Sequence, residues 1–301
     1  MILSNRTRVC KQLAFLFTLN RMASLKTLFE HQGHWGYHYS TLCRIFDAVM
    51  SIVYIRFRHI VLDSNLHFFA RRFALYHRKF QARIVAPVPL GVANICGTID
   101  ATVFPVCKTD DQQLQLVIYN GKDRVHAIKF QNTSFPDGLG VMTGPMVGRR
   151  HDEMLLDLAN TNDAMNDLQL AADIPPVEHK TLYMDKGYVS RSHCRAAFRN
   201  GVNLVEWMVV VENTKMKVPR GVCAEMPFGN ILSQNKYLAF SKGLKLQMSG
   251  VGVFYIVGCL FANAHSCLYG NTVSEYFDCQ PPRLYDYMQC RERGVLPEFP
   301  Y

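Results

Sequence analysis

The spacing of apolar residues changes near residue 90, and this change most limits how the chain can fold. From about 9 to 80, apolar residues recur every three or four positions, which predicts helices. After residue 94 come short runs rich in β-branched and aromatic residues, which predict strands. Between the two patterns lies APVPLGVAN (86–94), whose prolines cannot continue a helix. We therefore predict a helical region over 1–90 and a separate domain over 91–301.

The second region alternates strand and helix patterns. NICGTIDATVFPV (94–106), LQLVIYN (114–120) and RVHAIKFQNTSF (124–135) predict three consecutive antiparallel strands. Further strands are predicted at TLYM (181–184) and LVEWMVVV (204–211). Helices are predicted over 151–169, 190–199 and 221–240, the last interrupted early by Pro227, and a buried helix over 248–264. This order predicts the α/β class, with a mixed sheet and helices on its faces.

The positive charge of the chain lies almost entirely in the helical region. Residues 1–90 hold 13 Lys and Arg against 3 Asp and Glu, whereas residues 91–301 hold 20 against 21. Clustered cations neutralise phosphates, so this pattern indicates a nucleic-acid partner, although a solvated basic face gives the same balance.

The stretch GHWGYHYSTLCRIFDAV (33–49) has the pattern of a helix-turn-helix. Gly33 and Gly36 interrupt one helical pattern, and Ser40 or Thr41 is expected to cap a second helix that carries Arg44. The second helix of such a motif enters the major groove of DNA. A plain helical hairpin has the same pattern.

The cysteines and the apolar segments indicate an intracellular protein. Ten cysteines are scattered without a C-x-x-C pair, which is typical of reduced thiols. The stretch 248–264 falls short of a membrane span, and LAFLFTL (13–19) lacks a cleavage site. We expect neither export nor a membrane partner.

Two aspartates occupy unusual positions in apolar runs. Asp100 lies within the first predicted strand, and Asp185 directly follows TLYM. A lone buried carboxylate is costly, so each is expected to have a partner, and a mixed sheet of this order would place the two strands side by side. Neighbouring carboxylates share a proton or bind a divalent metal. Glu225 is the expected third ligand, with Glu206 and Glu212 as rivals. The alternative is that the acids have only structural roles. Asp100 would then cap a bulge, Asp185 would open a turn with Gly187, and Glu225 would be a surface acid near a helix start.

Motifs across 96–288 together resemble the transposases of the PIF/Harbinger type and their DDE endonuclease domain. The matching stretches are CGTIDATVFPVCK, YNGKDRVHAIKFQ, GRRHD, DKGY and AEMPFGNI, followed by a similar tail, ANAHSCLYGNTVSEYFDCQPPRLYDYM, in which Asn263 holds the L-x-N position of the family. The motifs occur in the order of that family. The N-terminal region is similar, less specifically, to the helix-turn-helix that precedes the nuclease.

The resemblance implies a ribonuclease-H-like fold and a nuclear, metal-dependent DNA nuclease and strand transferase. It implies that Asp100, Asp185 and Glu225 bind Mg²⁺ or Mn²⁺ in a two-metal mechanism. The expected partner is double-stranded DNA, as transposon ends and target, with an accessory DNA-binding protein or a second copy of the chain as further partners. The residues implied to contact phosphates are Arg124, His126 and Lys129, and those implied to brace the site are His151 and Asp152.

The sequence departs from the family pattern at several positions. Lys122 and Asp123 replace His-Lys, Ala101 replaces a glycine, Arg220 precedes Glu225 by five residues instead of four, and Pro227 follows Glu225 closely. Two other hypotheses therefore stay open. One is a decayed or domesticated transposase-derived protein that binds DNA without cutting it. The other is a ribonuclease-H-like phosphodiesterase that acts on RNA.

Overall fold

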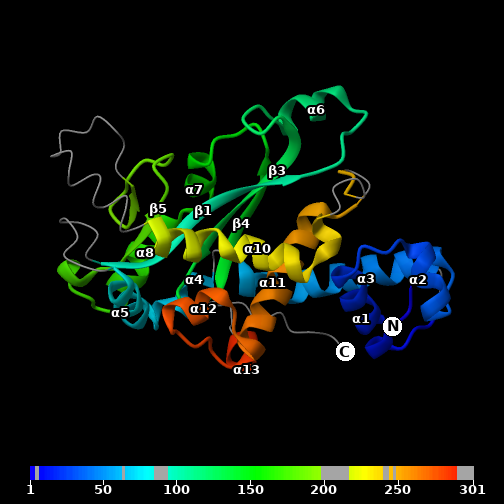
Figure 1. The fold of residues 1–301 in the computed structure, drawn as a ribbon, viewed down its shortest axis with the longest axis horizontal. Coiled ribbons are helices and arrows are strands. Elements are labelled where there is room, and N and C mark those ends of the chain that lie inside the picture. The colour runs from blue at the N-terminus through cyan, green and yellow to red at the C-terminus, as the bar shows by residue number, and fades with distance from the viewer. Residues whose placement is uncertain are drawn as a thin grey trace.

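A six-stranded mixed sheet with helices around it forms the centre of the protein (Figure 1). This computed structural model describes residues 1–3, 7–62, 65–84, 94–197, 217–239, 244–246 and 249–289. The strands follow the order β2-β3-β1-β5-β6, and β4 pairs with β3. The predicted α/β class is therefore confirmed. Strand 204–211 and most of the linker 86–94 lie outside the described residues.

Antiparallel and parallel pairings meet at β1. Strand β1 (Ile95–Pro105) pairs antiparallel with β3 (Val125–Ser134), and β3 pairs antiparallel with β4 (Gly140–Val147). On its other side β1 pairs in parallel with β5 (Thr181–Met184), and β5 pairs in parallel with β6 (Cys194–Ala196). The predicted neighbourhood of the first strand and TLYM is confirmed.

The prediction of a strand over 114–120 was wrong. Residues Gln112–Ile118 form helix α6, and only Tyr119–Asn120 pair with β3 as the short strand β2. The side chain of Asp111 accepts hydrogen bonds from the backbone N–H groups of Gln113 and Leu114. This N-cap provides acceptors for the first free N–H groups of a helix. It therefore favours a helix over a strand in a segment whose apolar spacing is compatible with either.

Two other strands differ from the prediction. Strand β4, GVMTGPMV, was not predicted, because Gly144 and Pro145 interrupt its pattern, yet both are tolerated on the outer strand. The helix predicted over 190–199 is wrong, since Cys194–Ala196 form β6 in register with Leu182–Met184. Cys194 and Ala196 are both buried, and partnership with β5 outweighs the local helical pattern.

The N-terminal region is helical, as predicted. It contains α1 (Lys11–Ala23), α2 (Leu28–Trp35), α3 (Tyr39–Val61), α4 (Leu66–Ala70) and α5 (Phe73–Arg83). Helix α2 ends at Gly36, whose φ of 70° suits glycine. The cap of α3, predicted at Ser40 or Thr41, is instead His38, whose imidazole accepts a hydrogen bond from the backbone N–H of Ser40.

The helical region packs directly against the rest of the protein. Helix α3 lies along α11, and α5 lies against β1 (Figure 1). The ring of Phe135, just after β3, stacks on Phe69 and Tyr76, with centroids 4.5 and 5.1 Å apart. Phe46 of α3 likewise meets Phe254 of α11 at 5.2 Å. The buried apolar residues of both regions therefore form one continuous core.

The helices that follow the antiparallel strands are interrupted at positions that the sequence did not fully predict. The predicted helix 151–169 is divided into α7 (Glu153–Ala159) and α8 (Thr161–Leu170) by Asn160, whose φ is 50°. The short 3-10 helix η2 (Pro176–Glu178) precedes β5. Residues 217–224 are helical, and a new helix, α10 (Met226–Gln234), begins after Glu225 with Pro227 in its first turn. The predicted early interruption of the helix 221–240 is confirmed, but α10 ends at Gln234 instead of continuing to residue 240.

Helix α11 (Val251–Tyr269) confirms the predicted buried helix. It is preceded by the 3-10 helix η3 (Lys236–Ala239) and followed by α12 (Thr272–Phe277) and α13 (Leu284–Met288). By length and composition α11 is the one described helix apolar enough to cross a membrane, but 61% of its most apolar window is buried inside the protein. Its contacts with α3 and β4 are those of a core helix.

Candidate active site

Asp100 and Asp185 lie next to each other because their strands are parallel neighbours. Ile99 of β1 is paired with Met184 of β5, and each aspartate is the next residue along its strand. Asp100 is still within β1, whereas Asp185 begins the turn after β5. The pairing therefore brings together two carboxylates that are far apart in sequence, as predicted.

Glu225 approaches the same place from the break between the helical segment 217–224 and α10. Its link to Asp185 is Arg220, which lies between them. The Nη1 atom of Arg220 is 3.5 Å from Oδ1 of Asp185, and its Nη2 atom is 3.8 Å from Oε1 of Glu225. The positive charge of the guanidinium also acts on Asp100, where it lowers the pKa. Two of the predicted acids thus pair with one cation of the protein itself, and the third, Asp100, lies within its electrostatic reach.

Burial makes the carboxyl group of Asp100 harder to ionise. The pKa of Asp100 is raised to about 6, mainly by loss of hydration and also by the negative charges of Asp185 and Glu225. A hydrogen bond from the backbone N–H of Ala101, 2.9 Å from Oδ1, and the charge of Arg220 act in the opposite direction. Asp185 and Glu225 are more open to water, with side chains 45% and 65% exposed.

This pKa shift predicts how stability depends on pH. The pKa of Asp100 is higher in the folded chain, about 6, than its ordinary value of 3.8, so the folded state binds the proton more tightly. Its contribution to stability is therefore complete below the ordinary pKa and is lost as the pH rises through about 6. Asp100→Asn is expected to raise the free energy of unfolding at neutral pH by about 1–3 kcal/mol. Urea unfolding across this pH range measures the effect.

The control for this prediction is Asp110→Asn, which changes an exposed acid in the loop before α6. It is expected to change stability by less than about 0.5 kcal/mol at every pH. An Asp100→Asn variant that is no more stable than the wild type at neutral pH would contradict the assigned cost of burying this carboxylate.

The turn after β5 is attached to α7. The backbone N–H of Val189 donates to Oε2 of Glu153 at 2.8 Å, and Arg191 donates to Glu153 and to Asp157, both at 2.9 Å. Within this turn the buried hydroxyl of Tyr188 lies 3.4 Å from Oε1 of Gln131 on β3. Burial, with the nearby acids, raises the pKa of Tyr188 well above its ordinary range. These contacts fix the position of Asp185.

Lys129 and Asp152, predicted at a phosphate contact and as a support, contact each other. The ammonium of Lys129 lies 2.7 Å from Oδ1 of Asp152 and donates to the backbone carbonyl of Arg150 at 2.9 Å. Lys129 is 8% exposed. This pair joins β3 to the start of α7, where the exposed His151 also lies. The arrangement gives Lys129 and Asp152 a positioning role, and their contact with DNA stays a prediction.

The other predicted DNA-binding residues lie at the surface. Arg124 is exposed in the turn that joins β2 to β3, with a φ of 57°. His126 is half-buried, and its ring packs against Tyr119 with centroids 5.5 Å apart. Arg44 is exposed on α3. Phosphate contacts by these residues stay predictions.

The acidic residues provide the right donor atoms for Mg²⁺ or Mn²⁺. Carboxylate oxygens are the ligands these ions prefer. Within the described ranges, however, no three His, Cys, Asp or Glu side chains are gathered closely enough to hold one metal ion. The space between Asp185 and Glu225 contains the guanidinium of Arg220 instead. In the described structure the three acids are therefore not arranged as metal ligands.

Sequence reasoning missed two features of this site. It noted Arg220 only for its spacing from Glu225 and did not predict an ion pair with Asp185. It also gave no role to Tyr188 and Gln131, although Tyr188 lies in the motif DKGY and Gln131 in the motif YNGKDRVHAIKFQ. Tyr188 could have been identified from its position in DKGY, because a residue three positions after Asp185 in a turn lies close to it.

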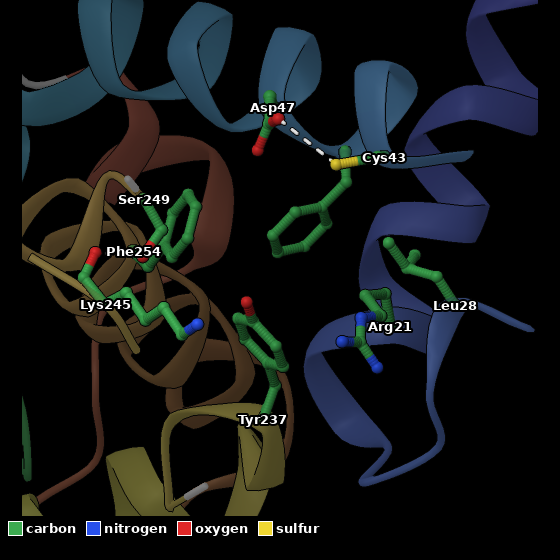
Figure 2. A pocket seen from close by; sticks show the side chains of 9 residues that line it. Arg21, Leu28, Cys43, Asp47, Tyr237, Lys245, Ser249 and Phe254 are labelled. Atoms are coloured by element: carbon green, nitrogen blue, oxygen red, sulfur yellow. Dashed lines mark hydrogen bonds between the residues drawn. The ribbon is translucent and has the colours of Figure 1, made fainter. Parts of the chain in front are cut away.

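Apart from the acidic residues, a hollow of about 230 Å³ lies where the helical region meets η3 and α11 (Figure 2). The guanidinium of Arg21 lies over the ring of Tyr237, 4.4 Å from its centroid. On the α3 side, the thiol of Cys43 donates to Oδ2 of Asp47 at 3.6 Å. Burial raises the pKa of both Cys43 and Asp47. The Arg21–Tyr237 contact crosses the junction, whereas Cys43 and Asp47 pair within α3, so the hollow is part of the packing between α1, α3 and η3.

The three acids all carry the same charge, whereas the hollow is lined by both cationic and acidic side chains. Asp100, Asp185 and Glu225 bring like charges together around a single cation, an arrangement that costs stability and is typical of functional sites. Comparisons with protein-family models, with curated proteins and with solved structures find no significant match for the chain.

Proposed function

We propose that the protein is a divalent-metal-dependent DNA endonuclease of the PIF/Harbinger transposase type, with a ribonuclease-H-like catalytic domain. The observation that carries the proposal is the grouping of three acids from β1, the end of β5 and the start of α10, with Arg220 paired to Asp185 and Glu225 and acting electrostatically on Asp100. A sheet with three antiparallel strands followed by two parallel ones supports the domain type. The motif order supports the family, and the scattered free cysteines agree with a nuclear location.

In this proposal Asp100, Asp185 and Glu225 hold the ion or ions. A bound Mg²⁺ or Mn²⁺ supplies a Lewis acid that activates water and stabilises the oxygen that leaves the phosphodiester. The chain itself positions the carboxylates. The loop of Asp185 is held by Glu153 of α7, and Asp100 is held within the sheet by β3 and β5. Arg44 and Arg124, both exposed, are proposed to contact DNA phosphates.

The test is cleavage of duplex DNA by the purified protein in the presence and absence of metal. We expect nicks or breaks with Mn²⁺ or Mg²⁺ on DNA that carries the ends flanking its own coding region, and none with EDTA. Cleavage of an RNA strand in preference to DNA would favour a ribonuclease-H-like phosphodiesterase instead. Cleavage that persists in EDTA would contradict the proposed chemistry.

One observation favours a second candidate function, a transposase-derived protein that binds DNA without cutting it. Arg220 already balances part of the acidic charge, and no three acids among the described residues are at the spacing of metal ligands. This candidate predicts duplex binding that weakens steeply with salt, together with the absence of metal-dependent cleavage. Fluorescence anisotropy with labelled DNA over a range of salt concentrations measures the binding independently of any cleavage.

A further inference from the structure

Arg220 has two properties of a cation that can be displaced. Its nitrogens lie 3.5 and 3.8 Å from the oxygens of Asp185 and Glu225, which is longer than the 2.7–2.9 Å typical of charge-assisted hydrogen bonds. The two acids it approaches have side chains that are 45% and 65% exposed. The guanidinium therefore neutralises the acids through space and does not form the paired fork that makes arginine contacts strong.

The position of Arg220 depends on the helix break at Glu225. Arg220 belongs to the helical segment 217–224, and α10 begins at Met226 with Pro227 in its first turn. The break places the two side chains near each other despite their separation of five residues, which would leave them on different sides of an unbroken helix. The Arg220 side chain itself is 23% exposed, so it has solvent beside it into which to move.

A divalent ion and this guanidinium exclude each other. Both would lie between Asp185 and Glu225, and like charges at such distances repel strongly. Without a cation, three carboxylates would face one another, which costs stability. A cation among the acids lowers this cost, and in the described structure that cation is Arg220.

We propose that Arg220 is an internal counter-cation that holds the acidic site together without metal and must leave before Mg²⁺ or Mn²⁺ binds. This inference rests on the proposed function of the same three acids. Arg220 then sets the metal affinity of the site by competition, as a residue that positions the acids and is not itself a ligand. Removing its charge strengthens metal binding and weakens the metal-free fold.

The test is calorimetric titration of the full chain with MnCl₂, comparing wild type, Arg220→Gln and Arg220→Lys. Arg220→Gln is expected to bind Mn²⁺ about tenfold more tightly than the wild type, because the competing charge is gone. Arg220→Lys keeps the charge and is expected to stay close to the wild type. The matched control is Lys79→Gln, which removes a cation of α5 paired with the exposed Asp278. Its affinity is expected to stay within about twofold of the wild type.

A second measurement does not depend on the glutamine variant being folded. In wild-type protein labelled with ¹⁵N, the side-chain signal of Arg220, assigned by its absence from Arg220→Lys, is expected to shift as diamagnetic Mg²⁺ is added. Equal or weaker Mn²⁺ affinity in Arg220→Gln, or an Arg220 signal that Mg²⁺ leaves unmoved, would overturn the inference while wild-type metal binding keeps the proposed nuclease. If neither protein binds metal, the inference and the metal-dependent function both fall.

Discussion

Asp137→Ala is expected to lower the free energy of unfolding by about 3–5 kcal/mol, the largest stability effect that we predict for a single residue. Asp137 is completely buried, and its Oδ2 atom accepts hydrogen bonds from Nη1 of Arg72 at 2.5 Å and from the hydroxyl of Tyr76 at 2.6 Å. Its Oδ1 atom accepts another from the backbone N–H of Leu139 at 3.2 Å. Removing the carboxylate leaves a cation and a buried hydroxyl without their partner. Urea unfolding followed by circular dichroism measures the loss.

The matched control is Asp278→Ala. Asp278 also pairs with a cation of α5, since its Oδ2 atom lies 2.8 Å from the ammonium of Lys79, but its side chain is 81% exposed. This surface pair is expected to contribute little, because water and salt screen it. Equal losses in the two variants would contradict the view that burial makes the Asp137 interaction important.

The Asp137 cluster also predicts how the two regions of the chain unfold. Arg72 and Tyr76 belong to the helical region, whereas Asp137 follows β3. The shared core and this buried ion pair predict a single unfolding transition for the whole chain. The predicted boundary near residue 90 stays a prediction about sequence organisation, but the helices before it are not expected to unfold independently.

Asp185→Asn is expected to reduce metal-dependent DNA cleavage by more than about 100-fold, because loss of outer partners of a metal ligand alone costs 10–100-fold. Asparagine keeps the size of the side chain and loses its charge. The Asp185 side chain is 45% exposed, so the fold is expected to tolerate the change. Initial rates on the same duplex, with equal DNA binding in both proteins, measure the effect on chemistry separately from binding.

The control for the nuclease test is Glu178→Gln, in the exposed 3-10 helix η2 that precedes β5. It removes one negative charge at a distance from the site and is expected to leave the cleavage rate unchanged. Asp185→Asn protein that cuts as fast as the wild type would exclude Asp185 from the reaction.

The sequence predicted the part of the site that depends on strand pairing. Asp100 and Asp185 follow apolar runs, and parallel neighbours place the equivalent ends of strands together. The sequence did not predict the third antiparallel strand, because Gly144 and Pro145 break the pattern of β4. It also assigned Cys194–Ala196 to a helix, since pairing with β5 is a tertiary effect that a local pattern does not contain.

The geometry of Arg220 was beyond sequence reasoning for a related reason. Counting five residues from Arg220 to Glu225 on a continuous helix places the two side chains on different sides. The helix instead breaks at Glu225 and restarts with Pro227 in its first turn, so the two side chains come within 3.8 Å. The restart itself was predictable from Pro227, whereas the direction of the new helix depends on its packing against α11 and η3.

Anomalous scattering from crystals soaked in Mn²⁺ shows whether Asp100, Asp185 and Glu225 form one cation site. We expect an anomalous peak at about 2.0–2.3 Å from oxygens of at least two of these acids, with Arg220 turned away from Asp185. A clear map without a peak among the three acids, with Arg220 still between Asp185 and Glu225, would show that they do not form a metal site.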